Sequence, residues 1–435
     1  AVWGMTQAAP ELVHWLLKLG VKFNMSGYDD VDLRNFGGQK KKRTAFAQSD
    51  TGKQIMTAMI DAVRRKEASG MVERFSHHSF LTLRLCGNIC CGCVIRDEYS
   101  QETVELPGDA VIVATGGMHG LFGNTTGSLS NTGEVTAELF RLGVPLANGE
   151  MIQYHPTTVK CGGKRILISE AARGEGGRLF AMKDGKQWYF MEEKYPELGN
   201  LMPRDITARE IWKVSHESEV FLDMTEISEE IISNKLSGLA DDCMTYLHKD
   251  IRKEPMSVLP GIHYFMGGIL VDEQHRTPIQ NLYAAGECCA QYHGANRLGG
   301  NSLLGALYGG RVAAKSACEQ ADVVDLSCAT QIDFPPASQI SEIKQLNKVM
   351  QETMGVVRNE NTLLNGIQTV QALTGNLPLL GMAVLKSALA RKESRGAHWR
   401  EDYPKSNDDD YLKTTVARFD GKQIQISFVP VPERR

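Results

Sequence analysis

Gln291-Tyr-His-Gly-Ala-Asn-Arg-Leu-Gly-Gly-Asn-Ser-Leu-Leu304 follows closely on Ala284-Ala-Gly-Glu287, and this stretch decides how the chain is interpreted. It combines Arg297 and a histidine with many glycines and alanines, a composition that an ordinary surface loop does not need. Glycine lets the backbone approach a flat ligand closely, and a helix that opens at Asn301 presents unpaired amides to oxygen atoms. The stretch therefore predicts a place where a cofactor meets a charged substrate.

The composition is that of a globular protein. Hydrophobic residues make up 42% and charged residues 23% of the 435 positions, enough for two or three domains. The net charge of −4 gives no bias towards nucleic acid, and the basic run Lys40–Arg43 is too short to change this. No apolar stretch has the roughly 18 residues of a membrane span, and no signal pattern opens the chain. We expect a cytoplasmic protein with no nucleic-acid partner and no direct membrane span, either free or peripheral at the inner face of a membrane through a partner.

The cysteines do not predict a metal site. Cys86 lies near the run Cys90-Cys-Gly-Cys93, which continues into Val94 and Ile95 with the alternation of a strand. This pattern favours packed, reduced thiols in a hairpin over metal ligands.

Strand signals lie in two separate parts of the chain. Ala110-Val-Ile-Val-Ala-Thr-Gly-Gly117 predicts a buried strand of the parallel kind that stops at glycines, where ligands bind in open α/β sheets. Mixed helices and loops follow, and strand character returns at Gly267–Asp272 and Asn281–Ala285. A domain inserted into a sheet domain explains this order. The chain is then helical from about 341 to 392 and ends in a strand near 423–429.

Five motifs occur in a fixed order between Gln153 and Leu304. Each alone is weak, since a single histidine or arginine is more often structural than functional. They are Gln153-Tyr-His-Pro-Thr157, Ser169-Glu-Ala-Ala-Arg-Gly-Glu-Gly-Gly177, Met202-Pro-Arg-Asp-Ile-Thr-Ala-Arg209, Gly261-Ile-His-Tyr-Phe-Met-Gly-Gly268 and the opening stretch.

Together these motifs resemble those of the fumarate reductase, succinate dehydrogenase and L-aspartate oxidase family of flavoproteins. The family versions of the first four read Q-F-H-P-T, T-E-G-x-R-G-E-G-G, P-R-D and H-Y-x-M-G-G. Ser169 replaces a threonine but keeps the hydroxyl, and Ala171 replaces a glycine. The resemblance implies an α/β fold with a Rossmann-like FAD-binding domain, an inserted α+β capping domain and a C-terminal helical region.

The expected domain limits follow from this resemblance. The FAD-binding domain would comprise 1–154 and 263–322, the capping domain 155–262, the helical domain 337–404 and a C-terminal tail 405–435. No G-x-G-x-x-G follows a strand near the start. We therefore expect the FAD-binding domain to be incomplete and to lack the family's N-terminal dinucleotide-binding unit.

The residue types suit a four-carbon dicarboxylate as substrate. Two negative charges enter a dry pocket only if each carboxylate meets cations and donors, and the planar guanidinium of Arg297 can hold one of them with two hydrogen bonds. By resemblance, His263 assists Arg297. Ser169 and His155 would bind the other carboxylate and twist it out of the plane of the double bond.

The resemblance also implies the reaction. A hydride passes between flavin N5 and one substrate carbon, while Arg204 exchanges a proton at the neighbouring carbon and is supplied by Glu170 and Arg173. A guanidinium is a poor acid, so proton delivery has to be concerted with hydride transfer. Electrostatic stabilisation by Arg204 alone is the simpler alternative.

FAD is the implied cofactor. Glu287 is placed to accept hydrogen bonds from ribitol or ribose hydroxyls, and Ser302 and Leu303 would present backbone amides to the flavin pyrimidine. Ala114, Thr115 and Gly116 would lie beside the dinucleotide. The family's T-G-D reads Thr132-Gly-Glu134 here, so a contact by Glu134 would come from a side chain one methylene longer.

Three functions remain open on the sequence. Interconversion of fumarate and succinate is favoured, with an iron-sulfur electron-transfer subunit as partner. L-aspartate oxidase is the alternative within the family, supported by Glu170-Ala171 and Pro203-Arg-Asp-Ile206. A non-catalytic or split flavoprotein fragment is a third.

Overall fold

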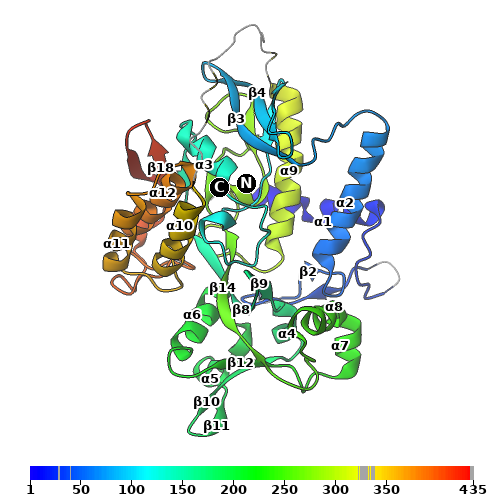
Figure 1. The fold of residues 1–435 in the computed structure, drawn as a ribbon. Coiled ribbons are helices and arrows are strands. Elements are labelled where there is room, and N and C mark those ends of the chain that lie inside the picture. The colour runs from blue at the N-terminus through cyan, green and yellow to red at the C-terminus, as the bar shows by residue number, and fades with distance from the viewer. Residues whose placement is uncertain are drawn as a thin grey trace.

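The computed structural model describes residues 1–27, 30–39, 41–321, 323, 332, 334 and 339–431. In Figure 1 the sheet domain occupies the middle, the inserted domain lies below it in green, and the C-terminal helices lie beside it in orange. Residue 322, residues 337–338, the last four residues of the predicted tail and Lys40 of the basic run lie outside the described residues. Among the described helices, none has both the length and the apolar character that a bilayer span requires.

A parallel strand pair forms the centre of the sheet domain. β6 (Val111–Val113) pairs in parallel with β16 (Leu282–Ala284), which confirms the parallel strand predicted at 110–117. Its burial is only partial, because Val113 is buried and Ile112 is exposed. Helix α9 (Asn301–Gln320) packs on this pair through small residues such as Ala313 and Ala317.

The N-terminal helices share an apolar cluster with α9. α1 (Val2–Leu19) ends at Gly20, whose φ of 101° lies in the left-handed region that favours glycine. Leu16 of α1, Ile55 and Leu307 of α9 belong to one cluster, so the first residues of the chain are part of the same domain as α9. The other elements of this part are β1 (Leu33–Arg34), β2 (Thr44–Ala45) and α2 (Thr51–Ala68).

The cysteine-rich segment forms an antiparallel sheet of three strands, β3 (His78–Cys86), β4 (Ile89–Asp97) and β5 (Thr103–Pro107). Cys90, Cys91 and Cys93 are free thiols, as expected. Cys86 is disulfide-bonded, so the expectation of a reduced thiol was wrong at this position.

The inserted domain has its own core and two small sheets. β8 (Ile152–Cys161) enters it and β14 (Leu259–Phe265) leaves it, and the two strands pair side by side. The limits of the capping domain predicted from the sequence, 154/155 and 262/263, fall within β8 and within β14 respectively. The remaining strands are β9 (Lys164–Leu167), β10 (Arg178–Lys183), β11 (Lys186–Trp188), β12 (Val220–Asp223) and β13 (Met256–Ser257), and the helices are α4 (Glu170–Gly174), α5 (Phe190–Lys194), α6 (Arg204–Val214), α7 (Glu229–Lys235) and α8 (Ser237–Asp242).

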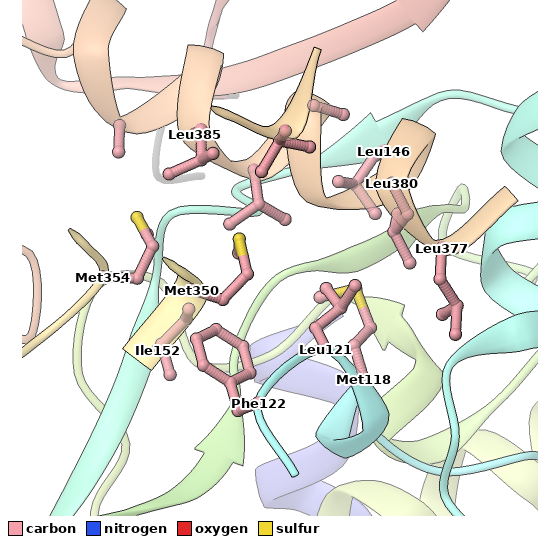
Figure 2. Close-up of a cluster of buried hydrophobic side chains, with 14 of the residues drawn as sticks. Met118, Leu121, Phe122, Leu146, Ile152, Met350, Met354, Leu377, Leu380 and Leu385 are labelled. Carbon is pink, nitrogen blue, oxygen red and sulfur yellow. The ribbon is translucent and has the colours of Figure 1, made fainter. Parts of the chain in front are cut away.

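The C-terminal helices cover one side of the sheet domain. α12 (Asn376–Ala390) packs on α3 (Glu134–Arg141), and α10 (Ile340–Thr353) and α11 (Glu360–Val370) pack on α12 and on each other around the buried cluster of Figure 2. The predicted tail contains a short helix and two strands of a five-stranded sheet. That sheet comprises β17 (Cys289–Ala290), β15 (Gly268–Leu270), β7 (Leu146–Ala147), β18 (Lys413–Phe419) and β19 (Ile424–Pro430), and the helix is α13 (Asp408–Tyr411).

The cluster in Figure 2 predicts a large effect of one truncation. Leu380 is fully buried there, so Leu380→Ala should lower the free energy of unfolding by about 2–5 kcal/mol, because it removes apolar contacts and leaves a cavity. Leu364 in α11 is 47% exposed and serves as the matched control. Leu364→Ala should change stability by less than about 0.5 kcal/mol. Denaturant titration followed by tryptophan fluorescence checks both, and equal losses would contradict the assignment of this core.

Candidate active site

The site begins at the N-terminus of α4. Ser169 is the N-cap of this helix, and its Oγ accepts a hydrogen bond from Ala171 N at 3.2 Å. This contact leaves the hydroxyl proton of Ser169 available to a ligand. Glu170 is the first residue of the helix and its side chain is almost completely buried, so the fold places a carboxylate where it needs cationic partners.

Two arginines supply those partners. Arg204, at the start of α6, donates from Nε and Nη2 to Glu170 Oε2 at 3.0 and 2.7 Å. Arg173 donates from Nη2 to Glu170 Oε1 at 3.2 Å. Burial disfavours the charged carboxylate, but the positive charges of Arg204 and Arg173 outweigh it and lower the pKa of Glu170 to about 2. Glu170 is therefore ionised at neutral pH.

Gln153 joins Arg204 to the opening stretch. Its Oε1 accepts from Arg204 Nη1 at 3.1 Å, and its Nε2 donates to the backbone oxygen of Arg297 at 2.7 Å. The sequence analysis quoted Gln153 in a motif but gave it no role. Its place two residues before His155 on the same strand was the available signal, because alternate strand residues face one side.

Two histidines face each other beside these arginines. The rings of His155 on β8 and His263 on β14 meet edge to face with centroids 5.2 Å apart. Thr126 Oγ1 lies 2.8 Å from Nδ1 of His263, while Nε2 of His155 is buried without a hydrogen-bond partner among the described residues. Burial, reinforced by the neighbouring positive charges, lowers the pKa of both histidines well below 6.5. Both are neutral at pH 7.

Arg297 completes the cluster. Its guanidinium lies over the ring of Tyr264 at 4.4 Å, and its Nε is buried without a hydrogen-bond partner in the described part of the chain. Burial and the charge of Arg204 lower the pKa of Arg297 to about 9. A buried cation with an unused donor is costly unless an anion joins it.

The charges of this cluster do not balance. Arg173, Arg204 and Arg297 are all buried, and Glu170 is the carboxylate that hydrogen-bonds to two of them. The orphaned nitrogens of His155 and Arg297 and the hydroxyl of Ser169 are further potential contacts. All seven substrate and catalytic residues predicted from the sequence therefore belong to one buried, electropositive neighbourhood that suits a dianion.

The predicted cofactor residues surround β6 and the start of α9. Glu287 accepts from the backbone N of Phe265 at 3.0 Å through Oε1. A Cβ at Gly117 would lie 2.6 Å from that same oxygen, so glycine is required there. Ala114 and Thr115 follow β6 and are exposed, and Gly116 has a φ of 73°.

The start of α9 fits a bound oxygen-rich group. Ser302 and Leu303 are in its first turn, which has no capping side chain, so first-turn amides are open to ligand oxygens. A Cβ at Gly299 would clash with Phe36, so glycine at this position lets the segment before α9 lie close to the segment around Phe36. Uncapped amides and an available carboxylate on Glu287 fit FAD. Glu134 is exposed at the start of α3, and its carboxylate accepts a hydrogen bond from Thr132 Oγ1 of its own turn at 3.4 Å.

Metal ligands are not clustered in this site. Within the described residues, no three histidine, cysteine, aspartate or glutamate side chains are arranged to hold a metal ion.

Comparisons with known proteins agree with this geometry. Residues 2–303 match the FAD binding domain model, and residues 373–434 match the fumarate reductase flavoprotein C-terminal model. The succinate dehydrogenase flavoprotein subunit of Bacillus subtilis is 36% identical over 99% of this chain and 84% of its own length. The L-aspartate oxidase of Pyrococcus furiosus is 32% identical over 94% and 81%. The structure of E. coli quinol fumarate reductase FrdA matches with a TM-score of 0.88 and 26% identity, over 99% of this chain and 83% of that one.

The first of these matches corrects one expectation. The FAD-binding domain model begins to match at residue 2, so the expectation that the family's N-terminal unit is missing is not borne out. The α/β architecture with a capping domain and a C-terminal helical region is confirmed. The chain belongs to the fumarate reductase, succinate dehydrogenase and L-aspartate oxidase family of flavoproteins and carries that family's FAD-binding domain.

Proposed function

We propose that this protein interconverts fumarate and succinate. The observation that carries the proposal is the buried cluster in which Glu170 holds Arg204 while Arg297, His155 and Ser169 keep unused hydrogen-bonding capacity. A dicarboxylate supplies the two negative charges that this cluster lacks. FAD, when bound, supplies the hydride chemistry.

Each end of the substrate has its own binding groups. Arg297 and His263 hold one carboxylate, and the stacking of Arg297 on Tyr264 fixes the plane of the guanidinium for a bidentate contact. His155 and Ser169 hold the other carboxylate as hydrogen-bond donors. Because both histidines are neutral, the pocket orients the dianion through directed hydrogen bonds as well as charge.

Arg204 acts on the substrate carbon next to the one that exchanges the hydride. Its Nε and Nη2 are committed to Glu170, so Nη1, which also contacts Gln153, is the nitrogen left to face the substrate. The proton that Arg204 gives up is replaced through Glu170 and Arg173, whose contacts form a continuous path. The ionised state of Glu170 suits this relay, because a carboxylate can accept a proton from one guanidinium and pass it to the other.

L-aspartate oxidase is the second candidate. Its support is the identity to the Pyrococcus furiosus enzyme and the Glu170-Ala171 sequence. Aspartate carries an ammonium group in addition to its two carboxylates. The surplus of buried arginines around Glu170 opposes a further positive charge, which favours fumarate and succinate over aspartate.

An electron-transfer partner is part of the proposal. Several relatives are flavoprotein subunits of succinate dehydrogenases or fumarate reductases. We propose that this chain likewise docks an iron-sulfur subunit. A visible spectrum of the purified protein tests the premise, because a preparation without flavin absorbance would favour the non-catalytic alternative.

Replacement of Arg204 should abolish turnover without loss of flavin. Arg204→Gln removes the charge and the proton donor, so kcat for fumarate reduction by reduced viologen should fall by at least about 10²–10³-fold. Arg209 lies on the same helix, stacks on Trp399 and provides a matched control. Arg209→Gln should keep kcat within a factor of about three. Near-normal turnover of Arg204→Gln would refute its role in proton delivery.

The choice between the two substrates is tested directly. The wild-type protein should reduce fumarate with viologen and show little oxidation of aspartate with oxygen. Arg297→Gln should raise the KM for fumarate by about 100-fold or more, because a bidentate charge-assisted contact is lost in a dry pocket. If aspartate oxidation is faster than fumarate reduction, the result favours L-aspartate oxidase and contradicts the proposed interconversion of fumarate and succinate.

A further inference from the structure

His119 is a buried histidine that the reaction proposed above does not use. It lies in the 3₁₀ turn η1 (His119–Leu121), six residues after β6 ends at Val113, and it is 4% exposed. Its ring meets the ring of Phe265 edge to face, with centroids 5.0 Å apart. A Cβ at Gly127 would lie only 2.4 Å from the imidazole, so the chain keeps this position free of a side chain and gives the ring a fitted place.

A short chain of polar groups passes through this ring. Gly127 N donates to Thr125 Oγ1 at 3.2 Å, and Thr125 Oγ1 lies 2.9 Å from His119 Nδ1. On the other side of the ring, His119 Nε2 lies 3.6 Å from Glu287 Oε1. That distance is longer than a hydrogen bond, so the contact is electrostatic and its sign depends on whether Nε2 carries a proton.

Thr125 decides that sign. Its oxygen accepts from Gly127 N and keeps a second lone pair, so the hydroxyl can either donate to His119 Nδ1 or accept from it, and the first arrangement is the one that places the ring proton on Nε2. A neutral imidazole that accepts at Nδ1 carries its proton on Nε2. The N–H of His119 then points towards the carboxylate of Glu287 and attracts it.

The carboxylate of Glu287 is thereby held at one oxygen. Phe265 N donates a hydrogen bond to Oε1, and His119 Nε2 lies 3.6 Å from the same oxygen. Among the described residues, Oε2 has no hydrogen-bond partner, and the side chain is 20% exposed. One oxygen is fixed by the protein, and the other is open to a ligand hydroxyl.

We propose that His119 is a positioning residue for FAD, which aims Glu287 by presenting an N–H that Thr125 holds on the correct ring nitrogen. The inference rests on the proposed role of Glu287 in binding cofactor hydroxyls. The titratable and charged groups around this contact are Glu287 on η4 (Gly286–Cys288), His263 and Tyr264 on β14, and Arg297. All of them remain in a comparison of two Thr125 variants.

The test is the affinity for FAD at pH 8, measured by quenching of flavin fluorescence as FAD is titrated into the apoprotein. Thr125→Val keeps the shape of the side chain but frees the imidazole to place its proton on Nδ1, so a lone pair on Nε2 faces Glu287. FAD binding should weaken about tenfold, the order expected for one lost contact to a charged group. In the Glu287→Gln background the same Thr125→Val change should leave the FAD affinity unaltered, because no carboxylate remains for the ring to position.

Thr125→Ser is the matched control, because it keeps the hydroxyl and should bind FAD with the wild-type affinity. His119→Leu should weaken FAD binding about as much as Thr125→Val, because it removes the same N–H. Equal FAD affinities for Thr125→Val and Thr125→Ser, or an equal effect of Thr125→Val with and without the Glu287→Gln change, would overturn the inference. Glu287→Gln separates the premise from the inference: unchanged FAD affinity in this variant would overturn the role of Glu287 itself, whereas weakened affinity would leave the Thr125 pair to decide.

Discussion

The structure of the site depends on one buried carboxylate, Glu170, that binds two arginines. Two guanidinium groups close together in a dry interior repel each other strongly, and the charge of Glu170 offsets that repulsion. The two arginines in turn keep Glu170 ionised, although burial alone would favour its neutral form. Because the carboxylate stays charged, Arg204 is held at two of its nitrogens, and Nη1 remains for the proposed substrate. Burial, reinforced by the same excess of positive charge, lowers the pKa of both histidines.

The fold supplies the positions that this interaction requires. Glu170 and Arg204 begin two helices of the inserted domain, and His155 and His263 lie on β8 and β14, the adjacent strands by which the chain enters and leaves it. Arg297 arrives from the sheet domain. The residues proposed to bind the substrate therefore meet at the junction of two domains, a common location for ligand sites.

The sequence predicted the residues of the site that carry charge better than it predicted the residues that contact and position them. Motifs with rare residue types identified the arginines and histidines, because their spacing matches a known family. Gln153 and Tyr264 stand in two of these motifs but were given no role, and His119 lies outside all five, since their contacts join distant segments of the chain. The parallel strand at β6 and the capping domain were foreseen from periodicity and resemblance. The strands of the predicted tail gave only a weak pattern, and their place in a five-stranded sheet depends on pairing with β7, more than 260 residues earlier.

Gln153 links two of the site's arginines across the junction between the domains. Its single amide contacts the guanidinium of Arg204 on one side and the backbone of Arg297 on the other. Gln153 and Arg297 belong to distant segments that meet at this junction, so the amide of Gln153 holds Arg204 and the backbone of Arg297 in one arrangement. The groups proposed as proton donor and carboxylate clamp are thus positioned relative to one another by a neutral side chain.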